Sequence, residues 1–281
     1  MSTTENFTNA SGLSYARTCY LGNNPLDEAW TSTRLTEEYL SWVERPAYIL
    51  LQQLDPEHNK PIPGKYKAIR GAKRGDSQYA RKTLSRFKTL HEKSERLKVK
   101  TSTRHTQALL ITLTYAKQKE SNWTSITSDW NTFITRLRKR HGKIEQVRML
   151  EAHKSGLPHL HAIIIFQTTR FNLKRWYSKK REKHIYILRS EKQRQAIKAL
   201  WPHGHLDIEG IYNLQGAIGY LFKYMTKLLT MELEHAAPHL AKLWVYRKRT
   251  WSVSQRLDNH LSNSNPEESE FHPLQPPPEE P

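Results

Sequence analysis

The chain has 281 residues, of which 37% are hydrophobic and one, Cys19, is a cysteine, so its composition excludes wholesale disorder and a scaffold of disulfides or Cys-rich zinc modules. The polar start and the lack of any apolar run near ~18 residues exclude a signal peptide and a membrane span, and we expect a soluble protein in the cytoplasm of its host cell. The formal net charge of +18 predicts a polyanionic partner, with nucleic acid as the first candidate and a merely soluble basic protein as the alternative.

The N-terminal part, residues 1–104, begins with a loose polar segment over 1–25. Residues 27–54 form an amphipathic stretch with an apolar end, which predicts a helix, and the prolines and glycine at 56–64 then interrupt regular structure. Residues 65–100 are strongly basic and are expected to include a surface helix. This basic segment either contacts phosphates or is a solvated charged face.

A new texture begins at residue 108, where the β-branched, apolar run at 108–115 predicts a buried strand. Apolar spacing predicts a helix that opens at Ser128 and stops at Gly142, after a basic last turn. A second strand is expected at 144–151 and a third at 159–166, joined by a turn rich in glycine and proline. The third strand is apolar on both faces after Ala162, so we expect it at the centre of a sheet.

The C-terminal part of the chain alternates basic and apolar segments. The expected elements are a helix near 190–200 in a basic stretch, a strand at 206–211, a long helix at 216–233 and a last ordered segment at 243–257. The tail at 259–281 contains Pro-Glu-Glu-Ser and Pro-Pro-Pro-Glu-Glu, and this composition predicts disorder.

Two histidines on the third strand form a candidate metal site. His159 and His161 are two residues apart, so their side chains project from the same face of the strand. Glu151 lies eight residues before His159 on the preceding strand, and a hairpin brings its carboxylate beside the imidazoles. Two nitrogens and one oxygen suit Mg²⁺ or Mn²⁺ with positions open to phosphate oxygen and water. His153 is the alternative third ligand.

The long helix at 216–233 presents two phenols and two ammonium groups together. Tyr220, Lys223, Tyr224 and Lys227 fall within a ~100° arc at helical spacing. The other side is apolar and carries Leu221, Phe222, Met225 and Leu229. Each tyrosine has a lysine three residues later, and such a cation lowers the pKa of a phenol or neutralises charge on an attacked phosphate. Because Lys is almost never buried, the face is not a core stripe.

In this order the motifs resemble the rolling-circle replication initiators of the HUH endonuclease superfamily. The apolar strand ends in Thr-Leu-Thr at 111–114, and Glu151 precedes the Gly-Leu-Pro-His-Leu-His run at 156–161, which is similar to the second motif of that family. The Tyr-x-x-Lys-Tyr-x-x-Lys pattern at 220–227 resembles the third motif of two-tyrosine initiators from small single-stranded-DNA phages and some plasmids. The resemblance covers about 105–257.

The resemblance implies an α+β fold, with a central antiparallel sheet and flanking helices over residues 105–258. It implies that His159, His161 and Glu151 hold a Mg²⁺ or Mn²⁺ ion and that Tyr220 or Tyr224 nicks single-stranded DNA at a replication origin, leaving a 5′-phosphotyrosine. The chain lacks a P-loop signature, so unwinding would come from a host helicase, and a host DNA polymerase would extend the 3′ end.

Three other interpretations remain open. A rolling-circle transposase would use the same chemistry, and a non-catalytic origin-binding regulator would keep the fold without nicking. A zinc hydrolase would use His153, His159 and His161. A second His-x-His pattern, His203 and His205, lies beside a proline at a predicted turn and is interpreted as structural.

Overall fold

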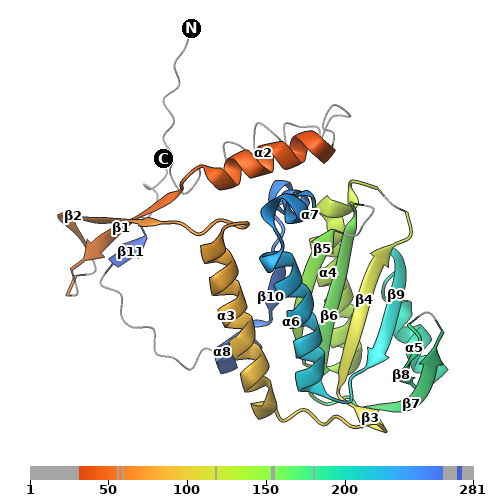
Figure 1. Cartoon of the computed structure of the whole chain (residues 1–281). Helices are drawn as coiled ribbons and strands as arrows, with labels where there is room; N and C mark the ends of the chain where they lie inside the picture. Colours follow the sequence, from red (N-terminus) through yellow and green to blue (C-terminus); the bar gives the residue numbers. More distant parts are fainter. Residues whose placement is uncertain are drawn as a thin grey trace, which may run out of the picture.

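The computed structural model describes residues 32–55, 57–58, 60–117, 119–152, 156–179, 181–261 and 271–273. These segments form an α+β fold in which helices cover both faces of a central antiparallel sheet (Figure 1). The predicted fold class is therefore confirmed, and the arrangement is consistent with an HUH-type core. The segment expected to be loose, Cys19 and most of the predicted tail lie outside the described residues. No helix among those described is long and apolar enough to cross a bilayer.

The central sheet has five strands in the order β10-β5-β6-β4-β9. Their bounds are Ala108–Tyr115 for β4, Ile144–Ala152 for β5, Pro158–Phe166 for β6, Gly204–Gly210 for β9 and Trp251–Val253 for β10. All neighbours in this sheet are antiparallel. β6 lies at the centre and is buried throughout 162–166, as the sequence predicted. The three strands expected at 108–115, 144–151 and 159–166 are confirmed to within one residue.

The side chains of β6 alternate between two apolar clusters on opposite faces of the sheet. Leu160 and Ile164 belong to one cluster, and Ile163 and Ile165 belong to the other. Because the alternation has a period of two, His159 and His161 project from the same face as Ile163 and Ile165. The candidate metal residues thus stand on the extension of a buried apolar stripe, which fixes the strand beneath them.

Five of the described helices cover the sheet, two on the histidine face and three on the other. The histidine face packs against α3 (Ser77–Lys93) and α6 (Leu214–Thr230). The opposite face packs against α2 (Ser32–Glu44), α4 (Asn122–His141) and α7 (Leu233–Val245). Figure 1 shows α3 and α6 in front of the sheet and α4 behind it. The helix that carries the tyrosines therefore lies over the face that carries the histidines.

Helix α6 is fixed at its start and along one side. The side chain of Asn213 accepts a hydrogen bond from the backbone N–H of Gly216, which caps the helix. Leu214, Ile218 and Leu221 follow at helical spacing with Met225, and all four are buried against the sheet. The predicted helix at 216–233 is found two to three residues earlier in the chain. Its buried side sets the direction in which the two tyrosines point.

Helix α4 begins at Asn122, so the predicted start at Ser128 is wrong by more than one turn. Trp123 and Ile126 extend the apolar spacing of Trp130 toward the N-terminus, and all three are buried. The predicted stop is confirmed, because Gly142 closes the helix with a φ of 75°.

The basic stretch after residue 170 contains a β-hairpin that the sequence analysis did not anticipate. It consists of β7 (Phe171–Ser178) and β8 (Lys183–Leu188), and β3 (His105–Thr106) completes a three-stranded sheet. The outer half of β7, residues 174–177, is exposed on both faces. A strand of this kind lacks the alternation of buried and exposed side chains that marks a strand in sequence. The helix expected near 190–200 is found as α5 (Glu191–Lys198).

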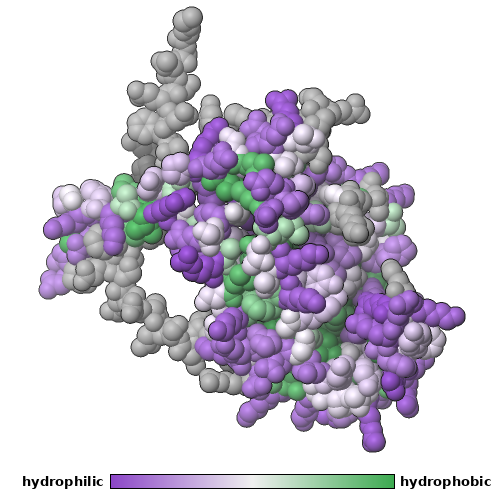
Figure 2. Space-filling model, viewed as in Figure 1, coloured by the Kyte–Doolittle hydropathy of each residue, from purple (hydrophilic) through white to green (hydrophobic). Residues whose placement is uncertain are grey.

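The N-terminal part forms a small sheet in the order β11-β1-β2, with bounds Phe271–Pro273, Tyr48–Leu54 and Pro61–Arg70. The expected helix is therefore wrong beyond Glu44, because Pro46 disfavours helical backbone before it and the apolar run pairs as a strand. The prolines of β2 are tolerated at the edge of a sheet. Figure 2 shows hydrophobic surface where Figure 1 places β1, whose Tyr48, Ile49 and Leu50 are exposed.

Short elements complete the fold. They are the 3-10 turn η1 (Ser94–Arg96) after α3 and the helix α8 (Gln255–Leu261) after β10. Within the predicted tail, α8 continues to Leu261, and β11 pairs with β1. The division into 1–104, 105–258 and 259–281 stays a prediction.

Candidate functional site

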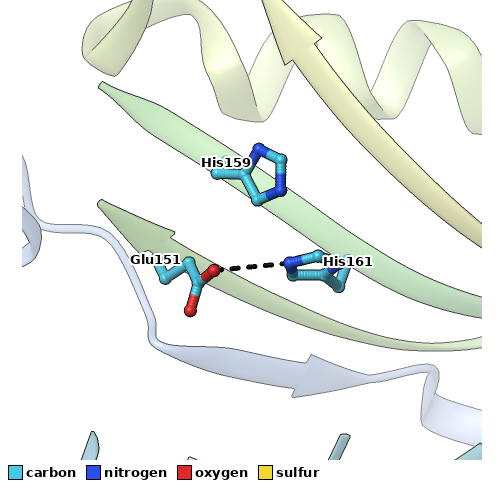
Figure 3. Close-up of side chains that lie close together, drawn as sticks. All are labelled: Glu151, His159 and His161. Carbon is cyan, nitrogen blue, oxygen red and sulfur yellow. Dashed lines mark hydrogen bonds and ion pairs between the residues drawn. The ribbon is translucent and has the colours of Figure 1, made fainter. Parts of the chain in front are cut away.

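The structure brings the three predicted metal ligands together. Glu151 on β5 is the register partner of His159 on β6, and His161 follows on the same face (Figure 3). One ligand atom from each of the three side chains lies within 4.8 Å of the other two. His161 Nε2 is 3.3 Å from Glu151 Oε1, and the two imidazole centroids are 4.6 Å apart. This spacing and this donor set fit one divalent cation.

Two threonines on β4 hold the imidazoles from behind. Thr112 Oγ1 lies 3.1 Å from His161 Nδ1, and Thr114 Oγ1 lies 3.1 Å from His159 Nδ1. When Nδ1 donates its proton to the hydroxyl, Nε2 of the same ring keeps its lone pair for a metal. The sequence pattern included both threonines in an apolar strand, but it did not reveal this orienting role, which depends on the pairing of β4 with β6.

The Thr112→Val/Thr114→Val variant is expected to bind Mn²⁺ about 10- to 100-fold more weakly, because such orienting partners contribute that much to metal affinity. Isothermal titration calorimetry measures the change. The matched control is Thr112→Ser/Thr114→Ser, which keeps both hydroxyls and should stay close to wild type. Equal affinity of the Val and Ser variants would show that the hydroxyls do not orient the rings.

The electrostatics of Glu151 favour a charged carboxylate. Burial raises its pKa, but the hydrogen bond with His161 and the charges of His161, His159 and His239 outweigh burial, and the pKa lies below its usual range. His239 comes from α7, and its Nδ1 lies 3.0 Å from the carbonyl oxygen of Ala152. The site therefore offers an ionised oxygen ligand at neutral pH.

The alternative ligand His153 lies outside the described residues. The other histidine pair is divided between two roles. His203 packs against the ring of Trp201, 4.8 Å between centroids, and its Nε2 is 3.7 Å from Asp129, which fits the structural interpretation. His205 stands on β9 and borders the cleft beside the metal residues. The sequence did not predict that placement.

Both tyrosines reach the metal residues. The ring of Tyr224 stacks on that of His161, with centroids 5.8 Å apart and an interplanar angle of 27°. The hydroxyl of Tyr220 is 2.9 Å from the hydroxyl of Tyr224. Tyr220 is 38% exposed, so its phenol is open to a substrate. The structure thus places two phenols and a candidate metal centre at one position on the sheet.

The lysines of the same helix are placed differently from the expectation. Lys223 and Lys227 are exposed on α6. The cation whose charge acts on Tyr220 is Arg181, from the turn between β7 and β8. Its guanidinium donates to Asp207, at 2.8 Å, and to Glu209, both on β9.

The pKa of Tyr220 is raised to about 12, and the expected lowering by a lysine is not observed. Burial raises it most, followed by the hydrogen bond and charge of Tyr224, whereas Arg181 lowers it. Arg181 lies 39 positions before Tyr220 in a segment crowded with basic residues. No sequence pattern marked it, because only the hairpin brings it to the helix.

An open cleft of about 980 Å³ joins these residues. One end contains His159, His161 and Tyr220, and the other is bordered by the β7–β8 hairpin and α5. Its lining includes the basic side chains of Lys174, Arg181, Arg194 and Lys198. A cleft with this charge suits a polyanion that passes over the metal residues.

The comparisons with known proteins agree with this geometry. A model of a family of replication-associated proteins, the ORF2 type, matches residues 108–229, which is less than half of the chain. The matched span runs from the start of β4 nearly to the end of α6 and includes the metal residues, Tyr220 and Tyr224. This similarity supports a replication initiator. Neither the curated proteins nor the solved structures gave a match.

Proposed function

We propose that this protein starts and ends rolling-circle DNA replication of a plasmid or a phage, as a site-specific, metal-dependent endonuclease and strand transferase. The observation that carries the proposal is the meeting of two phenols with a two-histidine, one-carboxylate cluster. The similarity of residues 108–229 to replication-associated proteins supports the same conclusion.

Glu151, His159 and His161 would hold the ion. When bound, a Mg²⁺ or Mn²⁺ ion supplies positive charge to the oxygens of the scissile phosphate. The threonines behind the imidazoles keep both rings turned toward that position. The ionised Glu151 completes the set with an oxygen donor, which suits these ions better than an all-nitrogen site does.

One tyrosine then acts as the nucleophile, and Tyr220 is our choice for the first step. Its phenol oxygen bonds to phosphorus, its proton passes to water, and the bond from phosphorus to the 3′ oxygen breaks. The 3′ oxygen gains a proton from water and remains as a free hydroxyl that primes synthesis. The 5′ end stays on the protein as a phosphotyrosine. Arg181 stands where negative charge develops.

The second phenol explains how one protein could also end the cycle. After one round of synthesis the origin is regenerated, and Tyr224 would cleave it while Tyr220 still carries the first end. The freed 3′ hydroxyl then attacks the first phosphotyrosine, which closes the circle and releases Tyr220. The hydroxyls lie 2.9 Å apart, so both can reach the same phosphate position. Lys223 and Lys227 remain candidates for charge near these steps.

The test is covalent capture of DNA. Labelled single strands that cover the DNA flanking the gene are incubated with the protein and Mn²⁺, and the products are separated on a denaturing gel. We expect a protein–DNA adduct that survives detergent and chelator but not protease. The Tyr220→Phe/Tyr224→Phe variant should form none.

The matched control is Tyr177→Phe, which alters an exposed tyrosine on β7 and should leave the adduct unchanged. An adduct that persists in the double variant would remove the tyrosine mechanism. Binding of the origin without any nicking by wild type would favour the non-catalytic regulator.

A further inference from the structure

The cleft continues away from the metal residues onto one face of the β7–β8 hairpin. We propose that this face is a binding subsite for unpaired nucleobases next to the scissile phosphate, with Trp176 as the stacking surface. The inference rests on the proposed function, because it takes single-stranded DNA as the substrate. It adds the place where the protein would recognise bases.

Strand alternation separates the two faces of the hairpin. Lys174 and Trp176 border the cleft, together with their register partners Ile187 and Ile185 on β8. Arg175 and Tyr177 fall between them in sequence and therefore point to the opposite face. The cleft face thus combines an aromatic ring, two aliphatic side chains and a cation on adjacent strands.

Trp176 is exposed in a way that packing does not explain. Its side chain is 54% exposed, although it borders a cleft. Lys174 Nζ lies 5.8 Å from the centroid of the ring, so the ammonium stands beside the indole. A nucleobase offers a flat apolar face to such a ring and a phosphate to such a cation, and base–aromatic stacking of this kind is tolerant of sequence.

The surroundings favour a polyanion over an apolar or acidic partner. Arg194 and Lys198 of α5 line the same cleft, and the lower right of the molecule, where Figure 1 places β7, β8 and α5, is mainly hydrophilic in Figure 2. On this face of the hairpin, Trp176 and the isoleucines beside it provide the apolar surface. Aromatic surface bordered by cations is the arrangement with which proteins hold single strands.

The subsite is continuous with the proposed reaction centre. The cleft that contains Trp176 also contains Tyr220, His159 and His161. Arg181 belongs to the turn of the same hairpin and acts on Tyr220. A strand whose phosphate lies at Tyr220 would therefore pass along the hairpin, and unpaired bases on one side of the nick would reach Trp176.

The test measures binding by fluorescence anisotropy, with a labelled single strand of mixed sequence and about 16 nucleotides, in chelator so that no cleavage occurs. Trp176→Ala is expected to raise the Kd about tenfold, whereas Trp176→Phe keeps a ring and should recover most of the affinity. Tyr177→Ala is the matched control, since Tyr177 is 50% exposed on the opposite face of the same strand. It should bind like wild type.

A duplex of the same sequence provides the second measurement. Its bases are already stacked, so Trp176→Ala should bind it as wild type does. Equal effects of Trp176→Ala and Tyr177→Ala, or an equal loss on single strand and duplex, would overturn the stacking subsite. Replacing Lys198 by Gln should reduce the slope of log Kd against log salt by about 0.7, which is expected for one lost phosphate contact on a single strand. An unchanged slope would remove α5 from the proposed path.

The same proteins in the adduct assay separate the two proposals. If wild type binds the single strand through Trp176 but forms no adduct with Mn²⁺, the nicking function is wrong and the subsite stands. If adducts form and Trp176→Ala binds like wild type, the subsite is wrong and the function stands.

Discussion

The His159→Ala/His161→Ala variant is expected to lose detectable Mn²⁺ binding and to form the DNA adduct about a thousandfold more slowly. The ligand atoms of these residues and of Glu151 lie within 4.8 Å of one another, so their removal leaves one carboxylate. A bound metal contributes several kcal/mol to stabilising charge on a phosphate, and each 1.36 kcal/mol corresponds to a factor of ten in rate. Calorimetry measures the binding, and single-turnover adduct formation measures the rate.

His235→Ala is the control for this variant, because His235 is a histidine on α7 whose side chain is 73% exposed and pairs with Glu232. It should keep both metal binding and adduct formation. A double variant that still binds one equivalent of Mn²⁺ at wild-type affinity would show that the ion is held elsewhere. A variant that loses binding but keeps the rate would make the chemistry independent of the metal.

The metal residues could be found from sequence because strand geometry is local. The alternation that places His159 beside His161, and the short turn that returns Glu151 to them, require only one hairpin. The tyrosine face of α6 follows from helical spacing in the same way. Thr112 and Thr114 were within the pattern as well, but their contact with the imidazoles depends on which strand pairs with β6. Pairing is a tertiary fact that one strand does not encode.

Errors in the fold have the same origin. The run at 48–51 is apolar and follows a helix, and only pairing with β2 turns it into a strand. The hairpin at 171–188 contains many exposed basic and aromatic residues, and its outer half has no buried face to impose alternation. That hairpin supplies Arg181 and Trp176. The parts of the proposed site that sequence missed therefore lie where surface composition hides the strand.

Arg181 changes the electrostatic account of the nucleophile. The sequence assigned the neighbouring charge to Lys223, whereas the structure places a guanidinium held by two carboxylates of β9 near Tyr220. The pKa of Tyr220 stays at about 12 in spite of this charge, because burial and Tyr224 raise it more strongly. At neutral pH the phenol is therefore protonated, and its activation must come with the substrate and the ion.

Tyr220→Phe is expected to slow the first cleavage by about three orders of magnitude or more, because the loss of a nucleophile removes the reaction that proceeds through it. Tyr220 borders the cleft with both histidines and lies beside Arg181, whereas Tyr224 stacks on His161. Tyr224→Phe should keep the first cleavage. Its defect should appear in the second step, so that an oligonucleotide containing two origins yields the first adduct but no closed circle.

Rapid-quench gels separate the two steps, since the first adduct and the circular product differ in mobility. The hydrogen bond between the hydroxyls is lost equally in both single variants, so it cannot explain a difference between them. A first cleavage at wild-type rate in Tyr220→Phe would exchange the roles of the two tyrosines. Loss of first cleavage in both variants would mean that the phenols act as a pair, with one hydroxyl needed to position the other.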